Sequence, residues 1–397
     1  FKLRPLYFAA AAFTLVGSVM GLFSTSFGLL MAARLVQAAG SGIFIPLMMN
    51  TVLVIAPKRN LGTFLAIGGC VITFGPALAP TVCGALVTSA GWHSVFAVPL
   101  AAMAVLALMA LFAVKNMGFS PAHLDIPSTV LSAAFLCALS LGLVELTIDI
   151  PLAVGSLAVA VVTAALFVLR QLRCEHPLID LTPMKSRAFW PSVVLTTIAM
   201  MASFSMRVLL PLYLEGGTGL TAFAAGLLVL VPVLANAGTT LLGGRIMDAR
   251  GEWPLLPAGF AAIAAGFALM AALAPTLSLL AAFIAALLIM GGTGFIFSPS
   301  QTAGLRTLPA EMNPFGVAIS TTFVQIAACI GPSLYTGIMS TAQAGALAAG
   351  AGEALATAQG FSIAMVVAAC IAAAGCALAL VYSRAAVKRD AKRAGSM

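Results

Sequence analysis

The sequence predicts an all-α polytopic membrane protein, and three observations carry that prediction. Of its 397 residues, 62% are hydrophobic and only 8% are charged, whereas soluble domains have about 45–50% and about 25%. Apolar stretches long enough to cross a bilayer as a helix recur along the whole chain. Runs such as residues 100–114 do not alternate in polarity, which argues against transmembrane β-strands. The composition also excludes a water-soluble enzyme, a disordered protein and a nucleic-acid-binding protein.

The apolar stretches define the expected transmembrane helices, because a spanning segment must satisfy its own backbone hydrogen bonds in lipid. We expect twelve helices, at residues 5–23, 27–56, 61–89, 92–114, 125–147, 151–170, 188–215, 222–247, 254–274, 277–305, 315–340 and 359–383.

The basic residues predict how these helices are oriented. If the first helix begins on the cytoplasmic side, 17 of the 19 Lys and Arg fall on the inner side of the membrane. The charged residues of the outer loops are then all Asp or Glu. Since basic loops stay in the cytoplasm, we expect a multi-pass protein of the plasma (inner) membrane with both ends of this chain cytoplasmic. The basic tail 384–393 is interpreted as a solvated end, with contact to anionic lipid as the alternative.

An internal repeat connects the two halves of the chain. Residues 40–57 and 292–309 both start with Gly-x-Gly and end in Pro, at an offset of 252 residues, and a Gly-Pro pair follows each copy. Such repeats are typical of secondary transporters. In the second copy these elements fall in the fourth and fifth of six helices, but in the first copy they fall in the second and third. The repeat therefore predicts two helices ahead of Phe1, and fourteen in the full protein.

The same alignment predicts the domain organisation. Residues 1–114 are expected to form an N-terminal bundle with four of six helices present. Residues 115–187 are expected to form an inserted helix pair and a cytoplasmic linker. Residues 188–397 are expected to form a C-terminal six-helix bundle with a basic cytoplasmic tail.

Several motifs together resemble the major facilitator superfamily, in particular its fourteen-helix drug:proton antiporters of the EmrB/QacA type. They are ARLVQAAGSG (33–42), GPALAPTVCG (75–84) and GRIMDARG (244–251). The resemblance implies a major facilitator-type helical bundle that exports drugs or other small amphipathic molecules in exchange for protons, and so a role in multidrug efflux and antibiotic resistance. The chain departs from the family pattern at Lys2, where Gly is usual, and at Ala79-Pro80, where many members have Gly. The acid of the family's first-helix motif is expected upstream of Phe1.

Arg34 is the first candidate for proton coupling, because an ionisable group inside a span is costly and commonly functional. Arg34 and Gln37 lie on one helical face, and Gly40 and Gly42 continue toward a close helix contact. The resemblance implies that Arg34 stabilises the charged form of an acid on another helix. The alternative is a structural salt bridge or an interfacial anchor.

Arg207 is the second charged residue within a predicted span. It is suited to attracting an anionic substrate, and it is equally compatible with pairing to Glu145 or Glu215. The substrate-cavity candidates are three neutral polar residues within helices, which more often form hydrogen bonds between helices: Asn50, Asn236 and Gln325.

The conformational motifs combine absent side chains with missing backbone donors, which permits close packing and bending. The helix positions among them are Gly40, Gly42, Gly75, Pro76, Gly84, Gly331 and Pro332. On an inner loop, Gly244 precedes Asp248 and Arg250, which are expected to form a latch that breaks as the two bundles rock.

We expect no cofactor, with the proton gradient as the energy source, and no metal site, because the seven Cys lack metal or disulfide spacing. The alternatives to drug export are an exporter of a specific organic anion or metabolite and, more remotely, an intramembrane enzyme. Motifs of hydrolases, metalloproteases and nucleotide-binding loops do not occur in the sequence, so no enzyme is expected. The expected partners are a small-molecule substrate and the lipid bilayer, not nucleic acid, and accessory export components are left open.

Overall fold

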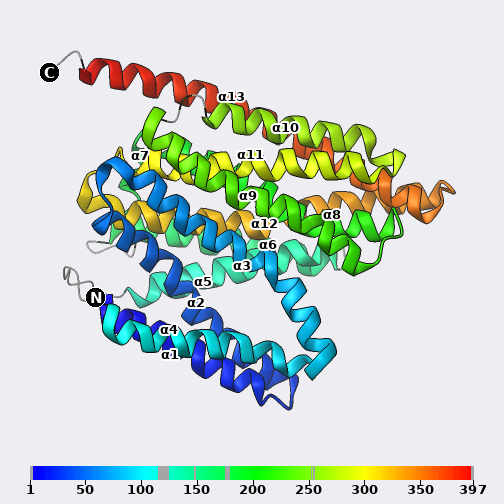
Figure 1. The fold of residues 1–397 in the computed structure, drawn as a ribbon, viewed down its shortest axis with the longest axis horizontal. Coiled ribbons are helices and arrows are strands. Elements are labelled where there is room, and N and C mark those ends of the chain that lie inside the picture. The colour runs from blue at the N-terminus through cyan, green and yellow to red at the C-terminus, as the bar shows by residue number, and fades with distance from the viewer. Residues whose placement is uncertain are drawn as a thin grey trace. The chain divides into compact units, whose positions relative to one another are not determined.

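The computed structural model describes residues 3–114, 125–146, 149–174, 179–251, 253 and 255–394. Within these ranges, the side chains of residues 58, 73, 74, 76–81, 84, 85, 87, 88, 222, 250 and 386–394 are outside the description. All regular secondary structure in the described part is helical (Figure 1). Eleven of the described helices are long and apolar enough to cross a membrane. The prediction of an all-α polytopic membrane protein is confirmed.

The chain folds into two compact units. Unit 1 comprises Phe1–Ile55 and Leu78–Leu124, and unit 2 comprises Ala56–Ala77 and Asp125–Met397. Unit 1 contains α1 (Leu3–Leu22), α2 (Phe27–Ile55), η2 (Trp92–Phe96), α4 (Ala97–Ala113) and the later part of α3 (Leu61–Ala90). The predicted domain boundaries after residues 114 and 187 stay predictions.

Unit 2 contains the first part of α3 and the rest of the helices. They are η1 (Lys58–Asn60), α5 (Ile126–Glu145), α6 (Ile150–Arg173), α7 (Thr182–Lys185), α8 (Trp190–Gly216), α9 (Ala222–Arg250), α10 (Leu255–Leu273), η3 (Ala274–Thr276), α11 (Leu279–Leu305), η4 (Ala310–Met312), α12 (Asn313–Ala348) and α13 (Glu353–Ala394).

Each of the twelve predicted spans falls on a helix of the described chain. The span predicted at 61–89 is the 30-residue helix α3, whose side chains are described only in part, so that its apolar stretch is counted as Leu61–Ile72. The main difference lies at the C-terminus. Helix α13 continues to Ala394, so the tail 384–393 is part of the last helix rather than a separate end.

The internal repeat is visible in the element boundaries. Helices α1, α2, η1 and α3 begin at residues 3, 27, 58 and 61, and α10, α11, η4 and α12 begin at 255, 279, 310 and 313. Each start is displaced by the same 252 residues. Pro57 and Pro309 precede the two short 3₁₀ helices with nearly the same backbone angles, φ −57° and ψ 135° against φ −59° and ψ 149°. The repeat therefore encodes the same succession of helices twice.

The core of unit 2 lies where α8, α10, α11 and α13 meet. Phe260 of α10, Ile289 of α11 and Phe361 of α13 are fully buried there. Helices α10 and α11 lie side by side (Figure 1), and they approach closely at Gly259 and Gly292. A Cβ on Gly292 would lie 2.6 Å from the Gly259 carbonyl oxygen, and one on Gly259 would lie 3.0 Å from that of Gly292. Small residues thus permit the close helix packing that is usual in membranes.

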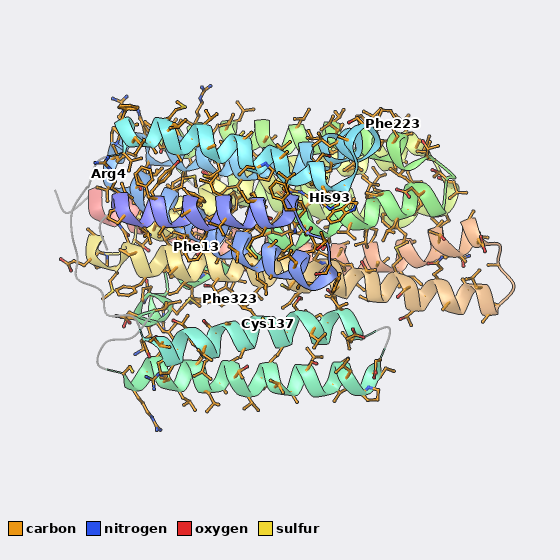
Figure 2. All side chains as sticks on the ribbon, turned by 90° about the horizontal axis from the view of Figure 1, so that it is seen from below. Arg4, Phe13, His93, Cys137, Phe223 and Phe323 are labelled. Atoms are coloured by element: carbon orange, nitrogen blue, oxygen red, sulfur yellow. The ribbon has the colours of Figure 1, made fainter. Side chains whose placement is uncertain are left out.

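Helices α5 and α6 form an antiparallel pair within unit 2, and α5 also contacts α12. Apolar side chains such as Val130 and Val161 are 61% and 70% exposed, and Cys137 is exposed as well. Figure 2 shows many side chains of this pair projecting away from the protein. Exposed apolar side chains on a spanning helix are suited to contact with lipid.

Candidate functional site

The carboxylate of Asp248, near the end of α9, is the centre of a cluster of polar contacts in unit 2. Its Oδ1 accepts hydrogen bonds from the Gly62 backbone N–H at 2.8 Å and from Arg306 Nη2 at 2.7 Å. Its Oδ2 accepts from the Thr63 N–H and the Thr63 hydroxyl, both at 2.7 Å. Gly62 and Thr63 lie in the first turn of α3, where N–H groups lack helical partners and the helix dipole favours a negative charge.

Glycines explain why the carboxylate reaches these groups. Gly244 lies one turn before Asp248 on α9 and packs directly on α3. A Cβ on Gly244 would lie 2.3 Å from the Ala66 Cβ and 2.6 Å from the Gly62 carbonyl oxygen. A Cβ on Gly62 would lie 2.8 Å from Asp248 Oδ1. The Gly-x-x-x-Asp spacing therefore places a helix contact and a capping carboxylate on one face.

The structure describes one partner of the latch that the sequence predicts at Asp248. Asp248 pairs with Arg306, 58 residues away at the end of α11, and the Arg250 side chain lies outside the described residues. Arg306 entered the sequence argument only as one of the inner basic residues. The internal repeat could have drawn attention to Arg306. This residue lies within the second copy, between the helix that contains Gly292 and the Pro309 that ends the copy.

Arg34 lies on α2 in unit 1 and begins a short chain of hydrogen bonds to α1. Its Nη1 donates to Gln37 Oε1 at 3.2 Å, and Gln37 Nε2 donates to Ser18 Oγ at 2.8 Å. Gly40 continues the same contact, because a Cβ there would lie 2.4 Å from Thr14 Oγ1. A Cβ on Gly42 would meet nothing within 4 Å. Arg34 and Gln37 thus lie on one face of α2 and are hydrogen-bonded to each other, and at Gly40 this helix packs closely on α1.

The guanidinium of Arg34 also borders an aromatic pocket. Its Cζ lies 5.6 Å from the centre of the Phe96 ring, and a cavity of about 310 Å³ is lined by Arg34 together with Phe27, Leu30, Met31, Trp92, Val95 and Phe96. Residues 1–124 contain no Asp and no Glu. Within this part of the sequence, Arg34 therefore has only neutral acceptors and aromatic faces available to it.

Arg207 lies within α8 and has few polar contacts. Its Nη2 donates to Ser203 Oγ at 3.4 Å, and its Cζ lies 5.6 Å from the centre of the Phe204 ring. Its Nε is buried without a hydrogen-bond partner among the described residues. The described residues give Arg207 no ion pair, with Glu145, Glu215 or any other acid. A buried cationic donor without a partner is costly, so this position is suited to receive an anionic group.

The three residues predicted to line a substrate cavity differ in burial and in their contacts. Asn236 is 2% exposed, and its Nδ2 donates to the Met290 carbonyl oxygen at 2.7 Å and to Thr293 Oγ1 at 2.6 Å. It therefore joins α9 to α11. Asn50 is half-buried on α2 in unit 1, and Gln325 is exposed on α12 in unit 2.

The two Gly-Pro pairs are not equivalent in their packing. A Cβ on Gly331 would lie 2.7 Å from Ser205 Oγ and 2.9 Å from the Met201 carbonyl oxygen, so α12 packs closely on α8 beside Pro332. A Cβ on Gly75 would meet nothing within 4 Å. The side-chain surroundings of Pro76 and Gly84 lie outside the described residues.

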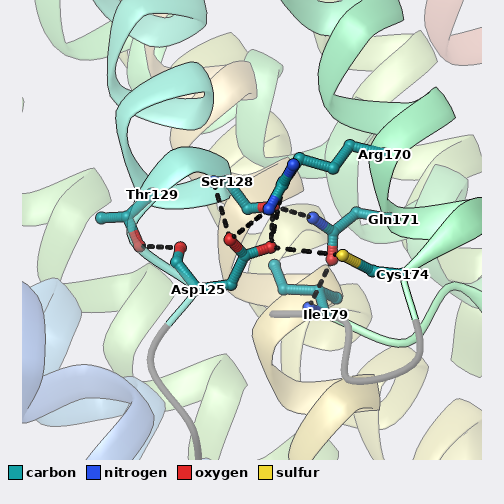
Figure 3. A network of polar contacts seen from close by, with 7 residues as sticks. All are labelled: Asp125, Ser128, Thr129, Arg170, Gln171, Cys174 and Ile179. Atoms are coloured by element: carbon teal, nitrogen blue, oxygen red, sulfur yellow. Dashed lines mark hydrogen bonds and ion pairs between the residues drawn. The ribbon is translucent and has the colours of Figure 1, made fainter.

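A second polar cluster, at one end of the α5–α6 pair, was not predicted (Figure 3). Arg170 donates from Nε and Nη2 to the two oxygens of Asp125, at 3.2 and 3.0 Å. Asp125 also caps α5 and accepts from the Ser128 hydroxyl. Gln171 donates to Ser128 at 2.6 Å and accepts from the Ile179 N–H at 3.0 Å. Asp-x-Pro-Ser at residues 125–128 is a helix-start signal that could have indicated part of this cluster.

The charge of Asp125 is strongly favoured in this cluster. The hydrogen bond from Arg170, followed by that from Ser128, lowers the pKa of the Asp125 carboxyl to about 2. The carboxylate therefore stays ionised throughout the physiological pH range, and the cluster is a permanent brace rather than a proton-exchanging site.

Comparisons with known proteins agree on one family. The sequence profile of the Major Facilitator Superfamily matches residues 1–332. The lincomycin resistance protein LmrB of Listeria monocytogenes serovar 1/2a is 32% identical over 343 residues, which cover 84% of this chain and 72% of the relative. The putative multidrug resistance protein MdtD of Escherichia coli (strain SE11) is 25% identical over 346 residues, which cover 83% and 71%.

Solved structures share the fold at low identity. The human organic anion transporter MFSD10 (TETRAN) superimposes with a TM-score of 0.67 at 14% identity, covering 95% of this chain and 77% of the other. The proton:xylose symporter XylE superimposes with a TM-score of 0.60 at 17% identity, covering 92% and 78%.

Proposed function

Because the chain belongs to the major facilitator superfamily, we propose that it is a secondary active transporter that exports drugs or other small amphipathic molecules in exchange for protons. The observation that carries the proposal is its 32% identity over 343 residues to a lincomycin resistance protein. The similarity to a putative multidrug resistance protein supports it further. One charge that crosses 100 mV supplies about 2.3 kcal/mol, enough to concentrate a substrate tens of times.

In this proposal the chain is embedded in the plasma membrane with its basic loops and both of its ends in the cytoplasm. The one-sided distribution of Lys and Arg supports that orientation. Two helical bundles then rock about a site near the bilayer midplane, as in other transporters built from repeats.

Asp248 is proposed to act as the inner latch of this cycle. It joins the start of α3 to the ends of α9 and α11 through four hydrogen bonds, of which the one from Arg306 is also an ion pair. The three hydrogen bonds from Gly62 and Thr63 are lost together if α3 moves away from α9. Such a contact is suited to a two-state switch, because it favours one packed arrangement rather than a continuum of positions.

Arg34 is proposed to act in proton coupling. Its link to Gln37 and Ser18 orients the guanidinium, and its aromatic pocket leaves space for another group. An acid placed there would be held in its charged form, and protonation would release it.

Everted membrane vesicles from cells that produce the complete protein test this function. With a proton gradient already formed, addition of lincomycin or a cationic dye should collapse part of the gradient, and vesicles with Arg34→Ala should show no collapse. Drug accumulation that continues without any movement of protons would exclude proton exchange. A gradient that neither lincomycin nor any dye disturbs would exclude drug export.

Export of a specific organic anion is the second candidate, and Arg207 is the observation that favours it. A buried guanidinium without an acidic partner in the described chain is suited to a carboxylate or a similar group. The same vesicles distinguish the two functions, because a response to organic anions and none to cationic dyes would select anion export.

A further inference from the structure

A groove of about 630 Å³ lies in unit 2, between the segment that leads into α8 and the C-terminal part of α13. Its size is within the ~300–1,000 Å³ range of small-molecule sites. One wall is formed by Ser186, Arg187, Ala188, Trp190 and Pro191, and the other by Leu378, Val381, Tyr382 and Ala385. Its lining contains neither the residues of the proposed latch nor Arg207, and the transport proposal does not use it.

The groove has an ordered floor. Tyr382 is 4% exposed, and its hydroxyl donates to the Ala188 carbonyl oxygen at 3.0 Å, which joins α13 to the start of α8. The turn before α8 is closed by the N–H groups of Phe189 and Trp190, which donate to the Ser186 carbonyl oxygen at 3.0 and 3.2 Å. Above this floor, the Trp190 ring is 38% exposed and Val381 is 67% exposed.

One end of the groove is strongly basic. Lys185, Arg187 and Arg384 are exposed, and the described residues give none of them an ion pair. Arg384 and Ala385 follow the groove residue Val381 by one turn of α13.

Helix α13 continues beyond the groove into a basic segment of the sequence. The lining residues of α13 follow each other at spacings of three, one and three, as on one face of a helix. Three basic residues follow Ala385 in the sequence by three, four and seven positions: Lys388, Arg389 and Lys392. The tail 384–393 contains five basic residues and one acid.

These features match one kind of ligand. An apolar wall is suited to an acyl chain, indole and phenol rings favour the level of the lipid headgroups, and guanidinium groups bind phosphate through charge-assisted hydrogen bonds. The predicted orientation places this end of the protein at the cytoplasmic leaflet, where anionic lipids attract basic segments. We propose that the groove binds one anionic phospholipid, with an acyl chain on Leu378 and Val381 and the phosphate between Arg187 and Arg384.

Trp190 provides a direct readout of the occupant. Trp92→Phe and Trp253→Phe, with Phe in place of any Trp outside these 397 residues, make it the single Trp of the protein. This variant of the complete protein is reconstituted in phosphatidylcholine vesicles that contain a fixed fraction of brominated phosphatidylglycerol or, separately, of brominated phosphatidylcholine. The anionic lipid should quench Trp190 more strongly, with a preference of about fivefold for each of the two arginines that contact it.

Substitutions test whether these arginines cause the preference. Arg187→Gln together with Arg384→Gln should abolish it, and the double Lys variant, which keeps the charges, should retain most of it. Arg173→Gln is the matched control, because Arg173 is exposed at the end of α6 and is not part of the groove. Circular dichroism and gel filtration verify that each variant is folded.

Two results would overturn the proposal. One is equal quenching by both lipids in the parent, and the other is a preference that persists in the folded double Gln variant. Inorganic phosphate separates a lipid site from a simple anion site. If added phosphate removes the preference at constant ionic strength, the groove binds a free anion and not a lipid. Loss of drug export leaves the quenching result unaffected, so the two proposals fail independently.

Discussion

Asp248 Oδ1 lies 2.7 Å from Arg306 Nη2, and the same carboxylate caps the first turn of α3 through Gly62 and Thr63. One side chain with 9% of its surface exposed thus holds three helices together. A buried carboxylate in such a position favours the packed state only while all of its donors are present. The first two predictions follow from this relationship.

Asp248→Asn should weaken the latch, because the amide N–H₂ faces donors and Arg306 loses its carboxylate. A loss of about 1–3 kcal/mol from the closed state is expected, which opens the inner side about 5–150 times more often. A reporter cysteine at Ala303, now 3% exposed, should then react faster with a maleimide in a variant that lacks the native Cys. Asp180→Asn is the control, since Asp180 accepts a hydrogen bond from the Thr182 N–H and has no ion pair among the described residues. Equal labelling rates in both variants would exclude the latch.

Gly244→Ala should destabilise unit 2, because the new Cβ would overlap Ala66. Overpacking of this kind costs about 1–3 kcal/mol. Gly238→Ala is a matched control in the same helix, since a Cβ at Gly238 meets nothing within 4 Å. Its effect should be neutral or slightly stabilising, because Ala favours the helix over Gly. Thermal unfolding in detergent measures both variants, and similar midpoints would contradict the close contact.

Arg207→Met should retain or raise stability while it lowers transport. The substitution removes a buried donor that has no partner among the described residues, and the apolar side chain fits the same space. Arg170→Met is the contrast, because Arg170 is paired with Asp125 and its loss should lower the unfolding midpoint. The relevant measurements are the unfolding midpoint and the initial rate of efflux. Normal efflux of every substrate from Arg207→Met would assign Arg207 no role in transport.

Asp125→Asn should lower the stability of the α5–α6 pair by the same amount at every pH between 5 and 8. The folded pKa is about 2, below the usual 3.8, so the stabilisation is fully present above pH 4 and is lost only as the pH falls through 2. Asp149→Asn is the control, since Asn caps a helix nearly as well as Asp and Asp149 has no ion pair in the described chain. A difference in midpoint that changes between pH 5 and 8 would refute this assignment.

Arg34→Ala should abolish proton-coupled efflux while the protein stays folded in the membrane. The reason is that Arg34 supplies the only charge among residues 5–57. Arg34→Lys should restore part of the activity, because it keeps the charge but not the forked hydrogen bonding. Gln37→Ala should have a smaller effect of the same kind, since Gln37 only orients the guanidinium. Efflux at the parent rate from Arg34→Ala would remove this residue from the mechanism.

The sequence predicted these features unequally well. The spacing of Gly244 and Asp248 indicated a functional loop, and the structure instead places both residues on the helix α9, packed against α3. The part of Arg250 in the latch stays a prediction, because its side chain lies outside the described residues. The ion pair of Asp248 with Arg306 was not predicted, since the two residues lie 58 positions apart in the sequence. The brace at Asp125 and Arg170 was not predicted, since its members lie 45 residues apart on two helices with no motif in common.

The sequence by itself determined the helices, the predicted orientation and the 252-residue repeat. These features depend on local quantities, namely the hydrophobicity of about 20 consecutive residues, the side of the membrane on which basic residues collect, and the positions of Gly and Pro. Only the tertiary structure decided the partners of Asp248, which are 185, 186 and 58 residues away. Periodicity shows which residues share a face of one helix, but how closely two helices approach depends on the packing of both, and here that packing depends on Gly62 and Gly244.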